Sequence, residues 1–203
     1  MPPQFRPSPL ALAVLGLLEA GPLHPYGMQR LIKQWGKDQV INVGQRTSLY
    51  RTIARLEQAG LIAAVGTDRD ERYPERTTYE VTDTGRVTTR LWLAEMVATP
   101  RNEFPEFPAA LSFLMLLSPD EVRLLLAERR QSLTQRLAEL DVDLATEIEG
   151  YQLPRVTLVE TEYLRAVTDA ELRWTTEILA ALDDGSLTWS REELEALAAI
   201  DQS

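Results

Sequence analysis

The chain has 203 residues, of which 44% are hydrophobic and 26% are charged, and its formal net charge is −10. These values favour a folded protein with one large domain or two small ones, and they argue against a disordered chain. With no cysteine and a single histidine, the sequence excludes disulfides, cysteine catalysis and a zinc site made of histidine and cysteine.

The charge is unevenly distributed along the chain. Residues 1–90 hold 12 Lys and Arg against 9 Asp and Glu, a balance of +3, and residues 91–203 hold the other 9 against 22, a balance of −13. Such asymmetry suggests two modules with different partners, which we place at residues 1–100 and 101–203. Salt screens charges beyond about 8–10 Å, so a distant acidic module does not prevent the first one from binding a polyanion.

The first predicted helix runs from about Pro9 to Glu19. Its run LALAVLGLL follows Arg6 and superficially resembles a signal peptide, but it is too short to cross a bilayer and no small-x-small cleavage site follows it. Ser8 and Pro9 fit an N-cap followed by proline at the first helical position. We therefore expect a core helix, no membrane span and a cytoplasmic protein.

A second helix is predicted from about Tyr26 to Trp35, and a third lies within QRTSLYRTIARLEQAGLI, residues 45–62. In the third helix Leu49, Ile53 and Leu56 recur at one-face spacing, which leaves an opposite face with arginines, and Gly60 is a natural stop. Alone, this pattern fits an ordinary amphipathic surface helix as well as a helix that enters a DNA groove.

Two strands and a fourth helix follow. LIAAVGT (61–67) and TTYEVT (77–82) read as strands on either side of the charged segment DRDERYPER, and a helix capped by Thr82 or Asp83 covers about 84–98. Three short helices followed by a two-stranded hairpin is the winged helix-turn-helix plan, in which the third helix is the recognition helix and the charged loop is the wing.

The remainder of the chain is predicted to be helical. We expect a short helix over 108–117, a long helix opened by the capping box of Ser118 and Glu121, and another long helix from Arg155 to Leu182. The apolar stripe of the last helix is predicted to be Val159, Tyr163, Ala166, Val167, Ala170, Trp174, Ile178 and Ala181. Such stripes need a partner, which could be the other long helix, the first domain or a second copy of the chain.

The segments LALAVLGLLEAGPLHPYGM, TSLYRTIARLEQAGLI and TTYEVTDTGRVTTRLWL together resemble the PadR family of transcriptional regulators. The region from PAALSFLMLLSPDE onward is similar to the helical C-terminal part of the longer PadR-like proteins. The resemblance implies a mainly α protein with an N-terminal winged helix-turn-helix and a C-terminal antiparallel helical dimerisation domain. It also implies a homodimer that binds double-stranded DNA and represses transcription. A small aromatic effector bound near the dimer interface would relieve the repression. The homodimer is expected to form through the C-terminal helices and helix four.

Candidate DNA-binding residues lie on the third helix and on the wing. Residues near the helix N-terminus can reach base edges or phosphates, and Arg51 is the best candidate for a bidentate contact with guanine. Tyr50 and Arg55 are expected to hold phosphates. The full set is Gln45, Thr47, Ser48, Tyr50, Arg51, Arg55, Arg69, Arg72 and Arg76. The wing also holds Asp68, Asp70, Glu71 and Glu75, so its arginines could instead be paired internally.

Other expectations concern ligands and chemistry. Trp92 and Met96 are candidate effector-pocket residues, although an apolar aromatic residue is more often part of a core. No nucleophile elbow, P-loop or dinucleotide fingerprint is present, and we expect no enzyme activity, cofactor or metal site. The alternative function is a winged-helix protein-interaction module that has lost DNA binding, which the acidic wing and the net charge suggest.

Overall fold

The computed structural model describes residues 7–44, 46–68, 76–151, 154–193 and 195. Contacts between residues divide the chain into two compact units, Met1–Asn102 and Glu103–Ser203, and each has its own hydrophobic core. Among the described residues, none of the helices combines the length and the apolarity that a bilayer crossing requires.

The first unit begins with helices whose starts are set by capping side chains. Helix α1 (Pro9–Leu18) starts at Ser8, whose Oγ accepts a hydrogen bond from the Ala11 amide at 3.2 Å. Helix α2 (Pro25–Gln34) starts at His24, whose Nδ1 accepts from the Gly27 amide at 2.7 Å. Each cap precedes a proline at the first helical position, where no backbone donor is needed. A short 3-10 turn, η1 (Lys37–Gln39), leads to helix α3 (Arg46–Gln58).

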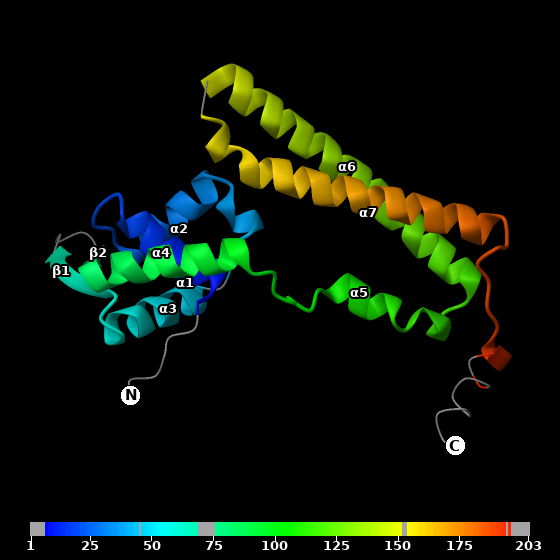
Figure 1. Cartoon of the computed structure of the whole chain (residues 1–203), viewed down its shortest axis with the longest axis horizontal. Helices are drawn as coiled ribbons and strands as arrows, with labels where there is room; N and C mark the ends of the chain where they lie inside the picture. Colours follow the sequence, from blue (N-terminus) through cyan, green and yellow to red (C-terminus); the bar gives the residue numbers. More distant parts are fainter. Residues whose placement is uncertain (1–6, 45, 69–75, 152–153, 194, 196–203) are drawn as a thin grey trace. The chain divides into compact units, whose positions relative to one another are not determined.

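The wing is an antiparallel pair of strands, β1 (Ile62–Asp68) and β2 (Arg76–Val81), with a β-bulge between Ala64 and Gly66. The linker between α1 and α2 joins the sheet through an isolated β-bridge, in which Leu23 and Tyr79 exchange both backbone hydrogen bonds, at 3.0 and 2.9 Å. This bridge ties the root of the wing to the start of α2 (Figure 1).

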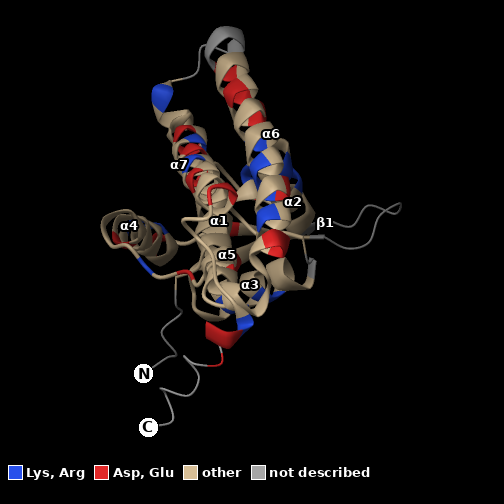
Figure 2. Cartoon of the chain, turned by 90° about the vertical axis from the view of Figure 1, so that its right-hand side faces the viewer, with Lys and Arg blue, Asp and Glu red and all other residues tan. Residues whose placement is uncertain are grey.

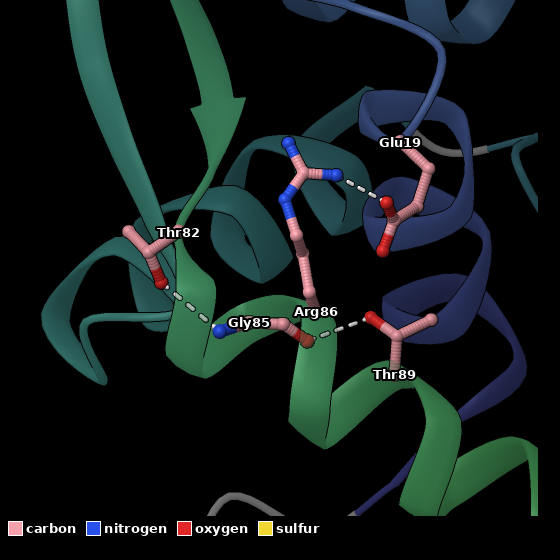
Figure 3. A network of polar contacts seen from close by, with 5 residues as sticks. All are labelled: Glu19, Thr82, Gly85, Arg86 and Thr89. Carbon is pink, nitrogen blue, oxygen red and sulfur yellow. Dashed lines mark hydrogen bonds and ion pairs between the residues drawn. The ribbon is translucent and has the colours of Figure 1, made fainter.

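Helix α4 (Asp83–Ala98) is joined to the rest of the unit by a polar network (Figure 3). The Thr82 hydroxyl caps the helix by accepting from the Gly85 amide at 3.0 Å, and it donates to the Gly60 carbonyl at 2.8 Å. Thr89 donates to the Gly85 carbonyl at 2.8 Å, and Arg86 forms an ion pair with Glu19 at the end of α1. Of the two predicted caps, Thr82 is the one that the structure uses.

The core of the first unit gathers apolar side chains from every helix and strand of the fold. Leu15, Met28, Leu49 and Ile62 are each at most 2% exposed, which shows that α1, α2, α3 and β1 meet in one core. The predicted winged helix-turn-helix is therefore confirmed, with the apolar side of α3 directed inward.

The second unit is built on a long antiparallel helical hairpin of α6 (Pro119–Tyr151) and α7 (Val159–Asp183) (Figure 1). The predicted capping box is confirmed at the start of α6. The Ser118 amide donates to Glu121 at 2.7 Å, and the Glu121 amide donates to the Ser118 hydroxyl at 3.3 Å. A 3-10 turn, η3 (Arg155–Thr157), precedes α7, so the α-helix begins a few residues later than predicted.

Side chains from three helices of the second unit meet around Arg129 on α6. The Arg129 Nε donates to the Glu171 carboxylate at 2.6 Å, and its guanidinium lies 3.4 Å from the ring centroid of Phe107. Phe107 in turn meets Trp174 edge to face, with 5.8 Å between ring centroids. This cluster docks α5 (Glu106–Leu111) onto the hairpin, and both charge signs line the two long helices (Figure 2).

One helix predicted for the second unit is wrong. The single helix expected over 108–117 is split into α5 and the 3-10 turn η2 (Leu114–Leu116), because Phe113 leaves the helical conformation with φ −123° and ψ 18°. Helix α5 starts early because Pro108 falls in its first turn, where a missing amide costs no hydrogen bond.

Most of the predicted stripe of α7 lies on the side of the helix that does not face α6. Val159, Tyr163 and Val167 are 51%, 68% and 46% exposed, whereas Leu158, Thr175 and Leu179 are buried. The first half of α7 is apolar on more than one side, so helical periodicity alone could not decide which side faces α6.

Candidate nucleic-acid interface

Helix α3 presents two chemically different sides. Leu49, Ile53 and Leu56 are 1%, 2% and 0% exposed, so they anchor the helix in the core as the spacing predicts. The opposite side is open to solvent and carries Thr47, Arg51, Ala54, Arg55 and Gln58. A helix held from behind with two arginines in front has the dimensions and charge that a DNA major groove accepts.

The predicted reading residues lie at different positions around α3. Thr47, Arg51 and Arg55 are exposed on the outer side, Tyr50 is 54% exposed on one flank, and Ser48 is half-buried on the other. Gln45 lies outside the described residues. The structure thus brings the described candidates of α3 to one surface, which is a precondition for a shared ligand.

Side chains outside the predicted set hold the turn before α3. Gln29 on α2 donates from Nε2 to the Val43 carbonyl at 3.3 Å, and the Asn42 carboxamide accepts from the Gly44 amide at 3.2 Å. These bonds fix where α3 starts relative to α2. The Asn-x-Gly sequence of residues 42–44 signals such a turn, whereas nothing in the sequence indicates the role of Gln29.

The other flank of α3 abuts the root of the wing. Burial raises the pKa of Tyr79 on β2, and the negative charge of Glu57 and the neighbouring Tyr50 raise this pKa further. Tyr79 therefore remains a neutral phenol near neutral pH. A neutral phenol adds no negative charge beside this surface.

Most of the predicted wing residues fall outside the part of the chain that the structure describes. Arg69 and Arg72 lie outside the described residues, and Arg76 is the first residue of β2, where its backbone pairs with Asp68.

The candidate effector residues lie on α4. Trp92 is 8% exposed and belongs to the core of the first unit, and Met96 is half-buried. Within the described ranges, no group of three His, Asp or Glu side chains comes together that could hold a metal ion.

Comparison with known proteins adds evidence of a different kind. Residues 14–90 match the model of the transcriptional regulator PadR-like family. A search of curated proteins finds no match.

Similar folds are found among solved structures. Bacillus subtilis PadR in complex with operator DNA superposes with a TM-score of 0.68 at 22% identity, covering 85% of this chain and 98% of that one. The same protein in complex with p-coumaric acid gives 0.66 at 21% identity, with 86% and 98% covered. The Vibrio cholerae virulence activator AphA gives 0.63 at 21% identity, also with 86% and 98% covered. At these identities the likeness shows the fold.

Proposed function

We propose that the chain is a homodimeric, sequence-specific repressor of transcription, because residues 14–90 match the model of the transcriptional regulator PadR-like family. The observation that carries the proposal is the exposed face of α3, where Thr47, Arg51 and Arg55 stand opposite a fully buried anchor. The similar PadR structure in complex with operator DNA supports it.

The proposed mechanism assigns different roles to the two sides of the reading face. Arg51 lies near the middle of the outer side and donates two hydrogen bonds to O6 and N7 of a guanine. Thr47 and Ser48, in the first turn, reach base edges or phosphates, as does Gln45. Tyr50 and Arg55 hold phosphates and so set the register of the helix on the duplex. The N-terminus of α3 adds a favourable dipole for phosphate.

A homodimer would present two such helices to successive major grooves. Half-sites would then lie about 34–36 Å apart on a roughly palindromic operator. In this proposal residues 1–100 read DNA, while residues 101–203 and α4 join the two copies. The arginines of the wing, Arg69, Arg72 and Arg76, supply a minor share of the phosphate contacts because four acidic residues lie among them.

We also propose that a small aromatic effector controls DNA binding. Its support is the similar structure that holds p-coumaric acid. A ligand near Trp92 and Met96 on α4 would change the spacing of the two recognition helices, because α4 follows directly from the wing. Quenching of tryptophan fluorescence by an aromatic acid, lost in Trp92→Phe, tests this assignment.

DNA binding is tested with Arg51→Ala and Arg55→Ala. We expect Arg51→Ala to weaken operator binding by about 1–3 kcal/mol and to relax the preference at one base pair. Arg55→Ala should weaken binding to all sequences and reduce the slope of log K against log salt by roughly 0.9. Arg173→Ala, an exposed arginine on α7, is the matched control and should change neither quantity.

Unchanged operator affinity and salt slope in both variants would exclude α3 as the reader. The alternative, a protein-interaction module without DNA binding, would then be favoured. The described outer face of α3 argues against that alternative, since it carries two arginines in place of a continuous apolar patch. A reporter gene placed behind a DNA sequence selected from a random pool for binding to the chain separates repression from activation, and activation would contradict the repressor assignment.

A further inference from the structure

The single histidine of the chain caps helix α2. His24 is the N-cap residue of this helix, and its ring Nδ1 accepts a hydrogen bond from the Gly27 amide at 2.7 Å. The amides of the first helical turn have no partner inside the helix, so a side-chain acceptor at this position stabilises the helix. The structure also describes caps at α1 and α4, but these are the hydroxyls of Ser8 and Thr82, which remain acceptors throughout the neutral pH range.

The ring of His24 lies directly over the backbone of Gly27. A Cβ built on Gly27 would lie 3.1 Å from both Nδ1 and Cε1 of the ring, and Gly27 itself is buried. Without the imidazole acceptor, the Gly27 amide would be a buried donor that lacks a partner, which is unfavourable. Loss of the acceptor therefore favours opening of the first turn of α2 to water.

This cap requires an unprotonated Nδ1. In the neutral imidazole one nitrogen accepts while the other carries the proton, whereas in the imidazolium both nitrogens are donors. A positive charge at the N-terminus of a helix is also repelled by the helix dipole. A second proton on the ring therefore removes the cap and adds repulsion, and both effects disfavour the first turn of α2.

The surroundings of His24 hold other ionisable groups, but they are carboxylates, phenols and strong bases. These groups are Glu19 after α1, Tyr26, Arg30 and Lys33 on α2, Tyr50 and Glu57 on α3, and Arg76, Tyr79 and Glu80 on β2. The ring of Tyr26 lies beside the imidazole, with 6.1 Å between ring centroids. Histidine is the only side chain whose ordinary pKa lies between 5 and 8, and the chain has one histidine and no cysteine.

The cap lies between two contacts that hold the recognition unit together. Leu23, the residue before the cap, exchanges both backbone hydrogen bonds with Tyr79 of the wing, at 3.0 and 2.9 Å. Gln29, further along α2, donates to the Val43 carbonyl in the turn before α3. Met28 is 0% exposed in the core, so we expect the unit to stay folded while an opened first turn weakens both contacts.

We propose that His24 is a positioning residue for DNA binding, and that a second proton on its ring weakens this binding as the pH falls from about 7.5 to 5.5. The inference rests on the proposed DNA-binding function and adds a dependence on pH to it. His24 acts through α2, the bridge to the wing and the turn before α3, and it needs no contact with DNA.

DNA binding at two pH values tests the proposal. A DNA sequence selected from a random pool for binding to the chain is titrated at pH 7.5 and 5.5, in the same salt, with the unmodified chain, His24→Asn and His24→Ala. Asparagine is a favoured N-cap whose carboxamide oxygen accepts a hydrogen bond without a titratable proton.

We expect the dissociation constant of the unmodified chain to rise between pH 7.5 and 5.5 by roughly three- to tenfold more than that of His24→Asn. His24→Ala has no cap at either pH, so it should bind more weakly than His24→Asn already at pH 7.5.

Three results would overturn the proposal. The first is an equal change with pH in the unmodified chain and in His24→Asn. The second is a smaller change in the unmodified chain, which would indicate that the imidazolium is attracted to phosphate. The third is a His24→Ala variant that binds as tightly as His24→Asn at pH 7.5, because the cap would then not position the recognition unit.

The protonation of the ring is the second measurement, and it needs no DNA. The chain has one imidazole, so its ¹⁵N signals are assigned directly. We expect a proton on Nε2 and none on Nδ1 at pH 7.5, and a thermal unfolding midpoint that falls between pH 7.5 and 5.5 by more than that of His24→Asn. A proton on Nδ1 at pH 7.5, or equal shifts of the two midpoints, would overturn the proposal. A chain with the expected ring and midpoints that selects no DNA would refute DNA binding itself, and with it the effect of pH on that binding, but not the cap.

Discussion

Single residues decide how closely α4 approaches the wing. Gly85 lies in the first turn of α4 directly against the backbone of Leu61, the residue before β1, and a Cβ built there would lie 2.0 Å from the Leu61 carbonyl oxygen and 2.7 Å from Val81 Cγ2. Neither neighbour can move away easily, because Leu61 is 6% exposed and accepts a hydrogen bond from the Thr82 amide. This glycine is required by close packing, since its φ is that of an ordinary helix.

We predict that Gly85→Ala lowers the free energy of unfolding by about 1–3 kcal/mol, because the added methyl group forces α4 away from β1. Gly16→Ala is the matched control. It lies inside α1 with no atom within 4 Å of a Cβ, and replacing a helical glycine by alanine stabilises a helix by about 0.5–1 kcal/mol. Chemical denaturation measures the free energy of unfolding of both variants. An unchanged free energy of unfolding in Gly85→Ala would contradict the close contact.

In the second unit, replacing a buried threonine is expected to stabilise the fold. Thr175 is fully buried, and its hydroxyl has no hydrogen-bond partner among the described residues. An unsatisfied buried hydroxyl is unfavourable, so Thr175→Val should raise the free energy of unfolding by on the order of 1 kcal/mol. Thr168→Val is the control, because its hydroxyl donates to the Leu164 carbonyl at 2.8 Å and that bond would be lost. A destabilised Thr175→Val variant would indicate a partner for this hydroxyl.

At the scale of elements, the stability of the first turn of α6 depends on pH. The backbone amide and then the hydroxyl of Ser118 donate to Glu121 and lower the pKa of its carboxyl below the ordinary value of 4.5. The ionised form is favoured in the folded state, so its contribution is complete above pH 4.5 and is lost as the pH falls through the lower folded-state value.

We predict that Glu121→Gln makes the chain less stable at neutral pH. The difference in unfolding free energy between the variant and the unmodified chain should shrink as the pH falls from about 5 to about 3, because the natural carboxylate is then protonated as well. Denaturant curves at a series of pH values measure this. Glu128→Gln, elsewhere on α6, is the control. A difference that stays constant with pH would contradict the role of the ionised carboxylate.

For the whole molecule, exposed apolar surface predicts self-association. Leu91 on α4 and Tyr163 on α7 are 65% and 68% exposed in a single chain, so both helices present large apolar side chains to solvent. If a second copy covers them, folding is linked to association, and the thermal unfolding midpoint should rise with chain concentration between about 1 and 100 µM. A midpoint independent of concentration would indicate a chain that is stable alone.

Local patterns were sufficient for most of the fold. Proline after Ser8 marked the start of α1, the spacing of Leu49, Ile53 and Leu56 identified the buried side of α3, and alternation of side chains placed both strands. These features depend on neighbouring residues, so they can be derived from the sequence. The exposed arginines of α3 followed from the same periodicity.

The sequence by itself determined that three helices precede a wing, that α3 has a buried and an exposed side, and that the acidic charge belongs to the second half of the chain. Only the tertiary structure decided which side of α7 faces α6, that Gly85 sits against Leu61, and that Gln29 holds the turn before α3. The physical reason is that periodicity records where apolar residues lie around one helix. Which of two apolar sides is buried depends on the shape and charge of a partner that is distant in the chain, or belongs to another copy of it.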